Sequence, residues 1–120
     1  MDYLLIFKKF LDTAIKERAS DLIISVAHPP TLRITGKLVP IVKEKIITPE
    51  DSRGLAFSLM DEDKKKKFLA DKEIDFSYDF DGKARFRVNI FFQRGSVSLA
   101  LRVIPSKIKT IEELSLPSIL

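Results

Sequence analysis

The sequence contains no cysteine and a single histidine, His28. The chain therefore cannot form a disulfide, and with a single histidine we expect no His/Cys zinc site and no serine or cysteine triad. No apolar run approaches the roughly 18 residues of a membrane span. The short apolar run Leu4–Phe7 also lacks the preceding basic region of a signal peptide. We therefore expect a cytoplasmic chain with no metal site and no direct membrane insertion, and we interpret His28 as a solvated turn residue.

A phosphate-binding P-loop is also missing. The dipeptide Gly-Lys occurs at residues 36–37 and 82–83, but neither copy has the glycine five positions before it or the hydroxyl residue after it that the motif requires. The chain alone is therefore not expected to hydrolyse a nucleotide or to hold one tightly.

Charge and composition predict one ordinary globular domain. The chain has 120 residues, 45% of them hydrophobic, and a net charge of +4 from 21 basic and 17 acidic residues. This excess is small and interspersed with acids, so it does not indicate nucleic-acid binding. The basic and aromatic stretch 83–92 does not change this view, because almost all of its aromatics fall on the buried side of a predicted strand.

Three helices are predicted. Residues 3–18 have apolar side chains at near-helical spacing, which indicates an amphipathic helix. Thr48 followed by Pro49 is a strong helix start, and that helix should run to about Met60. Asp61 can cap a third helix.

The remaining elements are extended. Residues 21–25 form a short apolar segment, and residues 31–42 are expected to form a hairpin around Gly36. From 73 to 104, two turn signals separate three runs in which apolar residues alternate with polar ones. The alternating apolar residues are Ile74, Phe76, Tyr78 and Phe80, then Phe86, Val88, Ile90 and Phe92, then Val97, Leu99, Leu101 and Val103. This pattern predicts a three-stranded antiparallel meander with one buried and one open face, and hence an α+β fold.

A symmetric turn at Arg94 and Gly95 places Arg87 directly opposite Arg102 on the open face. Two like charges about 5 Å apart repel by roughly 1 to 3 kcal/mol, so something should offset them. Either the nearby Asp75 and Asp79 neutralise the pair, or the pair holds an external anion such as a phosphate. The pattern alone favours neutralisation, since surface arginines usually extend into water.

Three other residues of the same strand face the open side and are candidates for an interface: Arg85, Asn89 and Phe91. If the first turn is a three-residue loop, Asp79 lies opposite Arg85.

Four short motifs occur in an order and spacing that cover nearly the whole chain. They are Ala19-Ser20-Asp21-Leu22, then Pro29-Pro30 with Leu32-Arg33-Ile34 and Gly36, then Arg85-Phe86-Arg87-Val88-Asn89, then Leu101-Arg102-Val103-Ile104-Pro105-Ser106. Together they resemble the N-terminal domain of the type IV pilus retraction ATPases of the PilT and PilU type, within the secretion ATPases. Ile23 stands where many PilT-type sequences have histidine, which is closer to the PilU type.

The resemblance implies a PAS-like domain over residues 1–108, with a mostly antiparallel sheet flanked by helices. Residues 109–120 would begin the linker to a RecA-like ATPase domain. In such motors ATP and Mg are held with the help of that second domain, six chains form a ring, and twitching motility depends on retraction of the pilus. Expected partners are the ATPase domain, neighbouring subunits and the pilus platform protein, which would keep the motor at the inner membrane.

The resemblance also implies that arginines on the sheet reach the nucleotide phosphates. Arg87 and Arg102 match the fifteen-residue spacing of the pair in the wider family, which shifts the balance toward the anion interpretation. Two alternatives stay open. One is a non-catalytic assembly module whose arginines pair with a neighbour's carboxylates, and the other is a PAS-like ligand sensor, which would need an enclosed apolar pocket.

Overall fold

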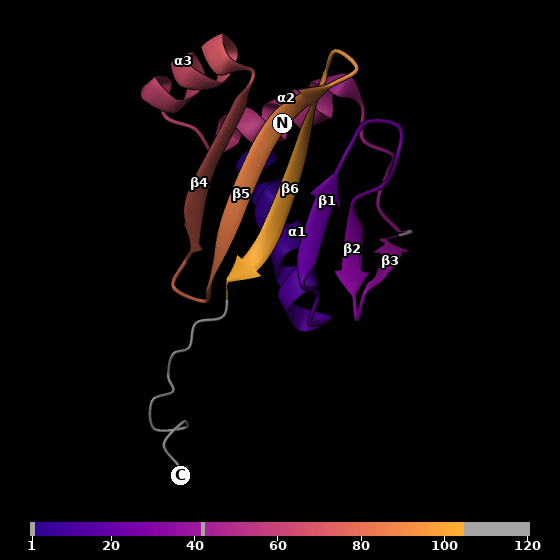
Figure 1. Ribbon diagram of the computed structural model, residues 1–120. Coiled ribbons are helices and arrows are strands. Elements are labelled where there is room, and N and C mark those ends of the chain that lie inside the picture. The colour runs from indigo at the N-terminus through magenta and orange to yellow at the C-terminus, as the bar shows by residue number, and fades with distance from the viewer. Residues whose placement is uncertain (1, 42, 105–120) are drawn as a thin grey trace.

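The structure, a computed structural model, describes residues 2–41 and 43–104 and contains three helices and six strands (Figure 1). In chain order the elements are α1 (Tyr3–Lys16), β1 (Asp21–Ile24), β2 (Thr31–Ile34), β3 (Lys37–Pro40), α2 (Pro49–Ser58), α3 (Glu62–Asp71), β4 (Glu73–Phe80), β5 (Ala84–Gln93) and β6 (Ser96–Ile104). The predicted α+β class is confirmed. The predicted domain end at residue 108 and the linker over 109–120 lie outside the described residues.

The helices begin where the sequence predicts. The side chain of Thr48 accepts from the backbone N–H of Asp51, whose carboxylate accepts from the Thr48 N–H in return, and this capping box starts α2 with Pro49 in its first turn. Asp61 caps α3 through a single hydrogen bond, which its carboxylate accepts from the backbone N–H of Lys64 at 2.8 Å. The first helix ends two residues before the predicted position, because Arg18 takes a left-handed φ of 58° that closes it.

All six strands form one antiparallel sheet in the order β3-β2-β1-β6-β5-β4. The predicted meander is confirmed residue by residue, including the pairing of Arg87 with Arg102 and of Asp79 with Arg85. The turn between β5 and β6 has positive φ at both Arg94 and Gly95, which suits the twist of a two-residue hairpin. The predicted hairpin is also confirmed as β2 and β3, although β3 stops at Pro40.

The strand β1 occupies the centre of the sheet. It pairs with β2 on one side and with β6 on the other, so that Asp21 lies between Arg33 and Arg102. The sequence indicates only a short apolar segment here and does not predict that it is a strand or where it lies in the sheet.

The core lies between one face of the sheet and helices α1 and α2, which Figure 1 shows behind the strands. α1 supplies Phe7 and Leu11 to this core, both completely buried. Helix α3 lies at the β4 end of the sheet, where Phe68 stacks on Phe92 with ring centroids 4.9 Å apart. Among the described residues, no helix has the length and apolar character needed to cross a bilayer.

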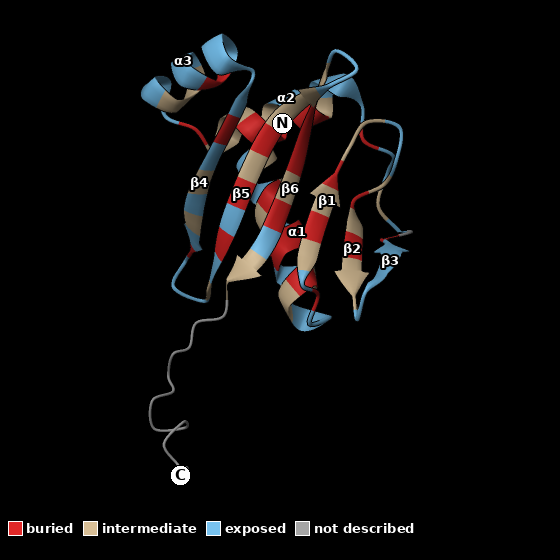
Figure 2. Ribbon diagram, viewed as in Figure 1, coloured by how far each residue is buried: buried red, intermediate tan, exposed pale blue. Residues whose placement is uncertain are grey.

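The opposite face of the sheet carries no helix from the described parts of the chain. Figure 2 shows buried and more exposed positions alternating along β4 and β5, as expected for strands with one face in the core and one face open. The predicted site residues Arg87 and Arg102 lie on this open face.

Candidate anion-binding site on the open sheet face

Four charged residues form one row across the open face, near the end of the sheet where β1 begins and β6 ends. Cross-strand pairing places Arg33 of β2 beside Asp21 of β1, Asp21 beside Arg102 of β6, and Arg102 beside Arg87 of β5. Each is a direct neighbour in the sheet, so the row contains three cations and one anion side by side.

Arg87 is held by a carboxylate from the edge strand. Its Nε and Nη2 atoms lie 3.2 and 3.3 Å from Oδ1 and Oδ2 of Asp75, a two-point contact of the kind that guanidinium and carboxylate groups favour. The hydrogen bond to Asp75 and then its charge raise the pKa of Arg87. The Arg87 side chain is nonetheless 69% exposed.

Arg102 is held by a different carboxylate, which local sequence patterns do not indicate. Its Nε atom donates to Oδ1 of Asp21 at 3.0 Å. The other oxygen of Asp21 accepts from the Ser20 hydroxyl at 2.8 Å and lies 3.4 Å from Nε of Arg33. Burial acts to raise the pKa of Asp21, but the hydrogen bonds from Ser20 and Arg102 and the charges of Arg102 and Arg33 together lower it.

The expected neutralisation of the arginine pair is therefore partly correct. Asp75 contacts Arg87 as expected, whereas Asp79 lies opposite Arg85 and forms no ion pair within residues 2–41 and 43–104. The second carboxylate that neutralises the pair is Asp21, which contacts Arg102. The signal that could have found it is its position in the Ala19-Ser20-Asp21-Leu22 motif, but its contact with Arg102 depends on a strand pairing that no local pattern reveals.

Both arginines retain donors that can bind an external anion. Arg102 uses only Nε in its hydrogen bond to Asp21, and its side chain is 73% exposed. A guanidinium group has five N–H donors, so each arginine keeps donors beyond those that its carboxylate uses. Arg87 and Arg102 are direct cross-strand neighbours, although their guanidinium groups contact carboxylates on opposite sides, Asp75 of β4 and Asp21 of β1. Free donors on two neighbouring arginines suit a phosphate, which carries several acceptor oxygens and more than one negative charge.

The three interface candidates lie on the same face but differ in their surroundings. Arg85 is exposed. Asn89 is half-buried and donates to Oε2 of Glu73 at 3.0 Å, so part of its role is to join β5 to β4. Phe91 is half-buried. The structure thus places them on the same strand as Arg87, and their role at an interface stays a prediction.

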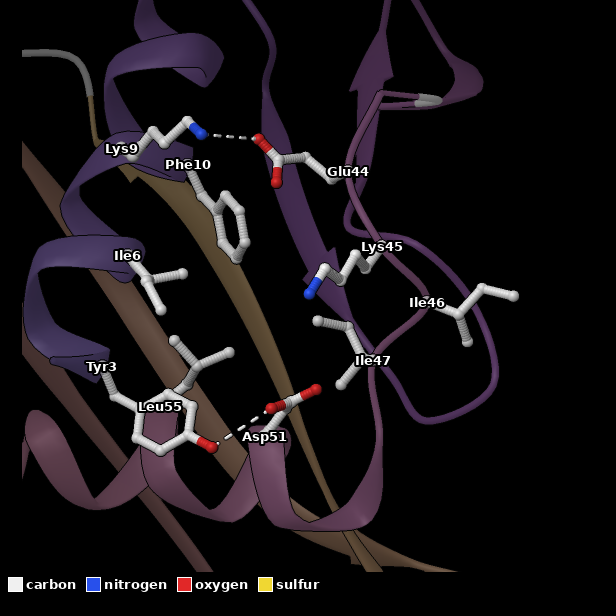
Figure 3. Close-up of a pocket in the computed structure, with 10 residues that line it drawn as sticks. All are labelled: Tyr3, Ile6, Lys9, Phe10, Glu44, Lys45, Ile46, Ile47, Asp51 and Leu55. Carbon is white, nitrogen blue, oxygen red and sulfur yellow. Dashed lines mark hydrogen bonds and ion pairs between the residues drawn. The ribbon is translucent and has the colours of Figure 1, made fainter. Parts of the chain in front are cut away.

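A small cleft lies on the helix side of the molecule. Figure 3 shows its walls, which come from α1, the segment 44–47 and the start of α2. Its volume is about 190 Å³, below the roughly 300 Å³ at which ligand pockets begin. Lys9 pairs with Glu44 at 3.4 Å and Tyr3 donates to Asp51 at 3.1 Å across it. This open cleft gives little support to the ligand-sensor alternative.

A second hollow is larger and polar. It has a volume of about 510 Å³ and is lined by residues that follow β1, including His28, and by the start of β6. His28 is exposed there, which confirms its interpretation as a solvated turn residue.

Comparison of the sequence with known proteins finds relatives among the type IV pilus ATPases. No protein-family model matches it. The type IV pilus ATPase PilU of Pseudomonas aeruginosa is 36% identical over 114 residues, which is 95% of this chain and 30% of that protein. The type IV pilus retraction ATPase PilT of the same organism is 36% identical over 105 residues, or 84% of this chain and 29% of that protein. The chain thus spans less than a third of the length of these relatives.

Solved structures agree with this placement. The crystal structure of the pilus retraction motor PilT with bound ADP matches with a TM-score of 0.81 and 38% identity, over 92% of this chain and 32% of that one. The ATPase DotB of Legionella pneumophila matches with a TM-score of 0.72 at 24% identity, over 95% of this chain and 32% of that one, and shows the shared fold. In sequence and in fold, the chain is an N-terminal domain of the type IV pilus ATPases represented by PilT and PilU.

Proposed function

We propose that this domain serves a hexameric type IV pilus retraction motor by placing Arg87 and Arg102 against the phosphates of ATP. A RecA-like domain of the same protein would hold the ATP and Mg, and the open sheet face would pack against that domain or a neighbouring subunit. The motor would be cytoplasmic and would reach the inner membrane through the pilus platform protein. We also propose that the fold of this domain is PAS-like.

The observation that carries the proposal is the placement of two exposed arginines side by side on a face that no described helix covers. Arginines aimed at a transferring phosphoryl group stabilise the charge that develops on it, and they are effective only once closure removes water. The open face suits both conditions, because its cations are accessible now and would be enclosed when another domain covers them.

The test is ATP hydrolysis by the complete motor carrying Arg87→Ala or Arg102→Ala. Arginine residues of this kind contribute about 10³ to 10⁵ in rate, and we expect losses of at least about tenfold for each. The matched control is Arg53→Ala, which removes an exposed arginine from α2 on the helix side of the sheet. An unchanged circular dichroism spectrum shows that the domain still folds. Normal turnover in both sheet variants contradicts the proposal.

The assembly module is the second candidate, and the ion pairs of the two arginines support it. Both arginines already contact carboxylates within this domain, which shows that carboxylates suit them. If a neighbour's carboxylates are the real partners, Arg87→Glu should abolish ring formation, and a reversed charge on the neighbouring surface should restore it. The phosphate model allows no such rescue.

A further inference from the structure

The two arginines occupy equivalent positions in the sheet but are held in different ways. Arg102 contacts Asp21, whose side chain is 13% exposed, and Arg87 contacts Asp75, whose side chain is 44% exposed. The two carboxylates therefore restrain their arginines to different degrees.

Asp21 is a fixed group. It lies on the central strand and has three partners, the hydroxyl of Ser20 and the guanidinium groups of Arg33 and Arg102. Loss of one partner leaves the other two in place, so an approaching anion cannot readily displace this carboxylate. Asp21 accordingly stays beside Arg102, and an anion at Arg102 would use the donors that Asp21 leaves free.

Asp75 is a group that can be displaced. It lies on the edge strand β4, and within the described parts of the chain its carboxylate pairs with Arg87 alone. Exposed ion pairs contribute little to stability, since water solvates both groups almost as well. A phosphate with more than one charge is a stronger competitor for the same guanidinium donors.

We propose that Asp75 is a releasable counter-ion that occupies Arg87 in the absence of ligand and gives it up to a phosphate group, while Asp21 keeps Arg102 in place. Asp75 is in this sense a positioning residue and not a catalytic one. The inference rests on the proposed function, because it concerns the same arginine pair, and it adds a regulatory step to it. A phosphate that takes the Nε and Nη2 donors of Arg87 breaks their contact with Asp75.

The test uses the 120-residue chain with tripolyphosphate as the probe at low ionic strength. The Nε–H resonances of Arg87 and Arg102, followed by ¹⁵N NMR, report binding at each arginine. The variant is Asp75→Asn and its matched control is Asp79→Asn. Both raise the net charge from +4 to +5 on the same strand and face, but only Asp75 contacts Arg87.

Removal of the competing carboxylate should tighten binding by about two- to fivefold, the equivalent of an exposed ion pair. Asp79→Asn should produce a clearly smaller change, and the gain from Asp75→Asn should vanish when Arg87→Ala is added. When tripolyphosphate binds, the Arg87 resonance should shift in the same direction as it does in Asp75→Asn without ligand. The Arg102 resonance should not show this correspondence.

Weaker or unchanged binding in Asp75→Asn overturns the inference, as does a gain that survives without Arg87 or is matched by Asp79→Asn. If neither the Arg87 nor the Arg102 resonance shows a saturable shift, the inference is overturned as well. None of these outcomes decides the proposed function, because the hydrolysis assay with Arg87→Ala and Arg102→Ala judges that separately.

Discussion

Replacement of Asp21 by Asn tests whether the charged row stabilises the fold. Asparagine has the same shape but a single acceptor oxygen, so the change removes the charge and one of the two acceptors, which contact Arg102 at 3.0 Å on one side and Ser20 and Arg33 on the other. A hydrogen bond to a charged group is worth about 1 kcal/mol more than a neutral one, and the exposure of the arginines reduces this gain. We expect the free energy of unfolding to fall by about 1 to 2 kcal/mol.

The assay is urea unfolding followed by far-UV circular dichroism. The matched control is Asp12→Asn, because Asp12 also pairs with a cation, Lys83 at 3.4 Å, but both side chains are 58% exposed. That change should cost less than about 0.5 kcal/mol. In thermal unfolding, Asp21→Asn should lower Tm by at least about 4 °C for a domain of this size.

The effect should also depend on pH in one direction. The pKa of Asp21 is lowered in the folded state, so its contribution is fully present above the unfolded value of about 3.9 and disappears as pH falls through the lower folded value. Wild type and Asp21→Asn should therefore converge in stability at strongly acidic pH. A difference below about 0.5 kcal/mol at pH 7, or one that persists unchanged in acid, would refute the reasoning.

Further predictions concern the core, the caps and the tyrosines. Phe68→Ala removes a completely buried ring and should cost about 3 to 5 kcal/mol in urea unfolding, and a loss under about 1 kcal/mol contradicts this. Thr48→Ala destroys the capping box and should cost about 1 kcal/mol, whereas Thr48→Ser should be nearly neutral. Gly54→Ala places a Cβ atom 2.3 Å from the Tyr3 ring, so it should destabilise the wild type yet stabilise a Tyr3→Ala chain by up to about 1 kcal/mol; the same sign in both backgrounds rules out the clash. Burial raises the pKa of Tyr78, so its absorbance titration should have a midpoint above about 10, and the stability it contributes should be lost as pH rises through that midpoint.

Much of the fold could be predicted because its signals are local. The capping groups Thr48 and Asp61 bond within a single turn of helix, and the turn at Arg94 and Gly95 determines the register of the two strands beside it. The same register is sufficient to predict that Arg87 and Arg102 lie opposite each other.

What could not be predicted depends on contacts between distant segments. The pairing of β1 with β6 joins Asp21 to Arg102 across 81 positions of sequence, and no turn or periodicity connects them. Local patterns therefore cannot identify Asp21 as the counter-ion of Arg102. They indicate Asp75 and Asp79, which lie near Arg87 along the meander, but Asp79 pairs with Arg85 in the sheet and forms no ion pair within the described residues.

The central position of β1 has a consequence for how the chain is made. β1 emerges early from the ribosome, but its partner β6 ends at Ile104, so the middle of the sheet stays incomplete until almost all of the described chain has been synthesised. Closure of so long a loop slows folding, because its entropy is lost before the contacts form. A nascent chain that stops before Ser96 would leave β1 and β5 each with one unpaired edge, and such edges readily pair with other chains. Folding of this domain is therefore expected to be completed late in synthesis and all at once.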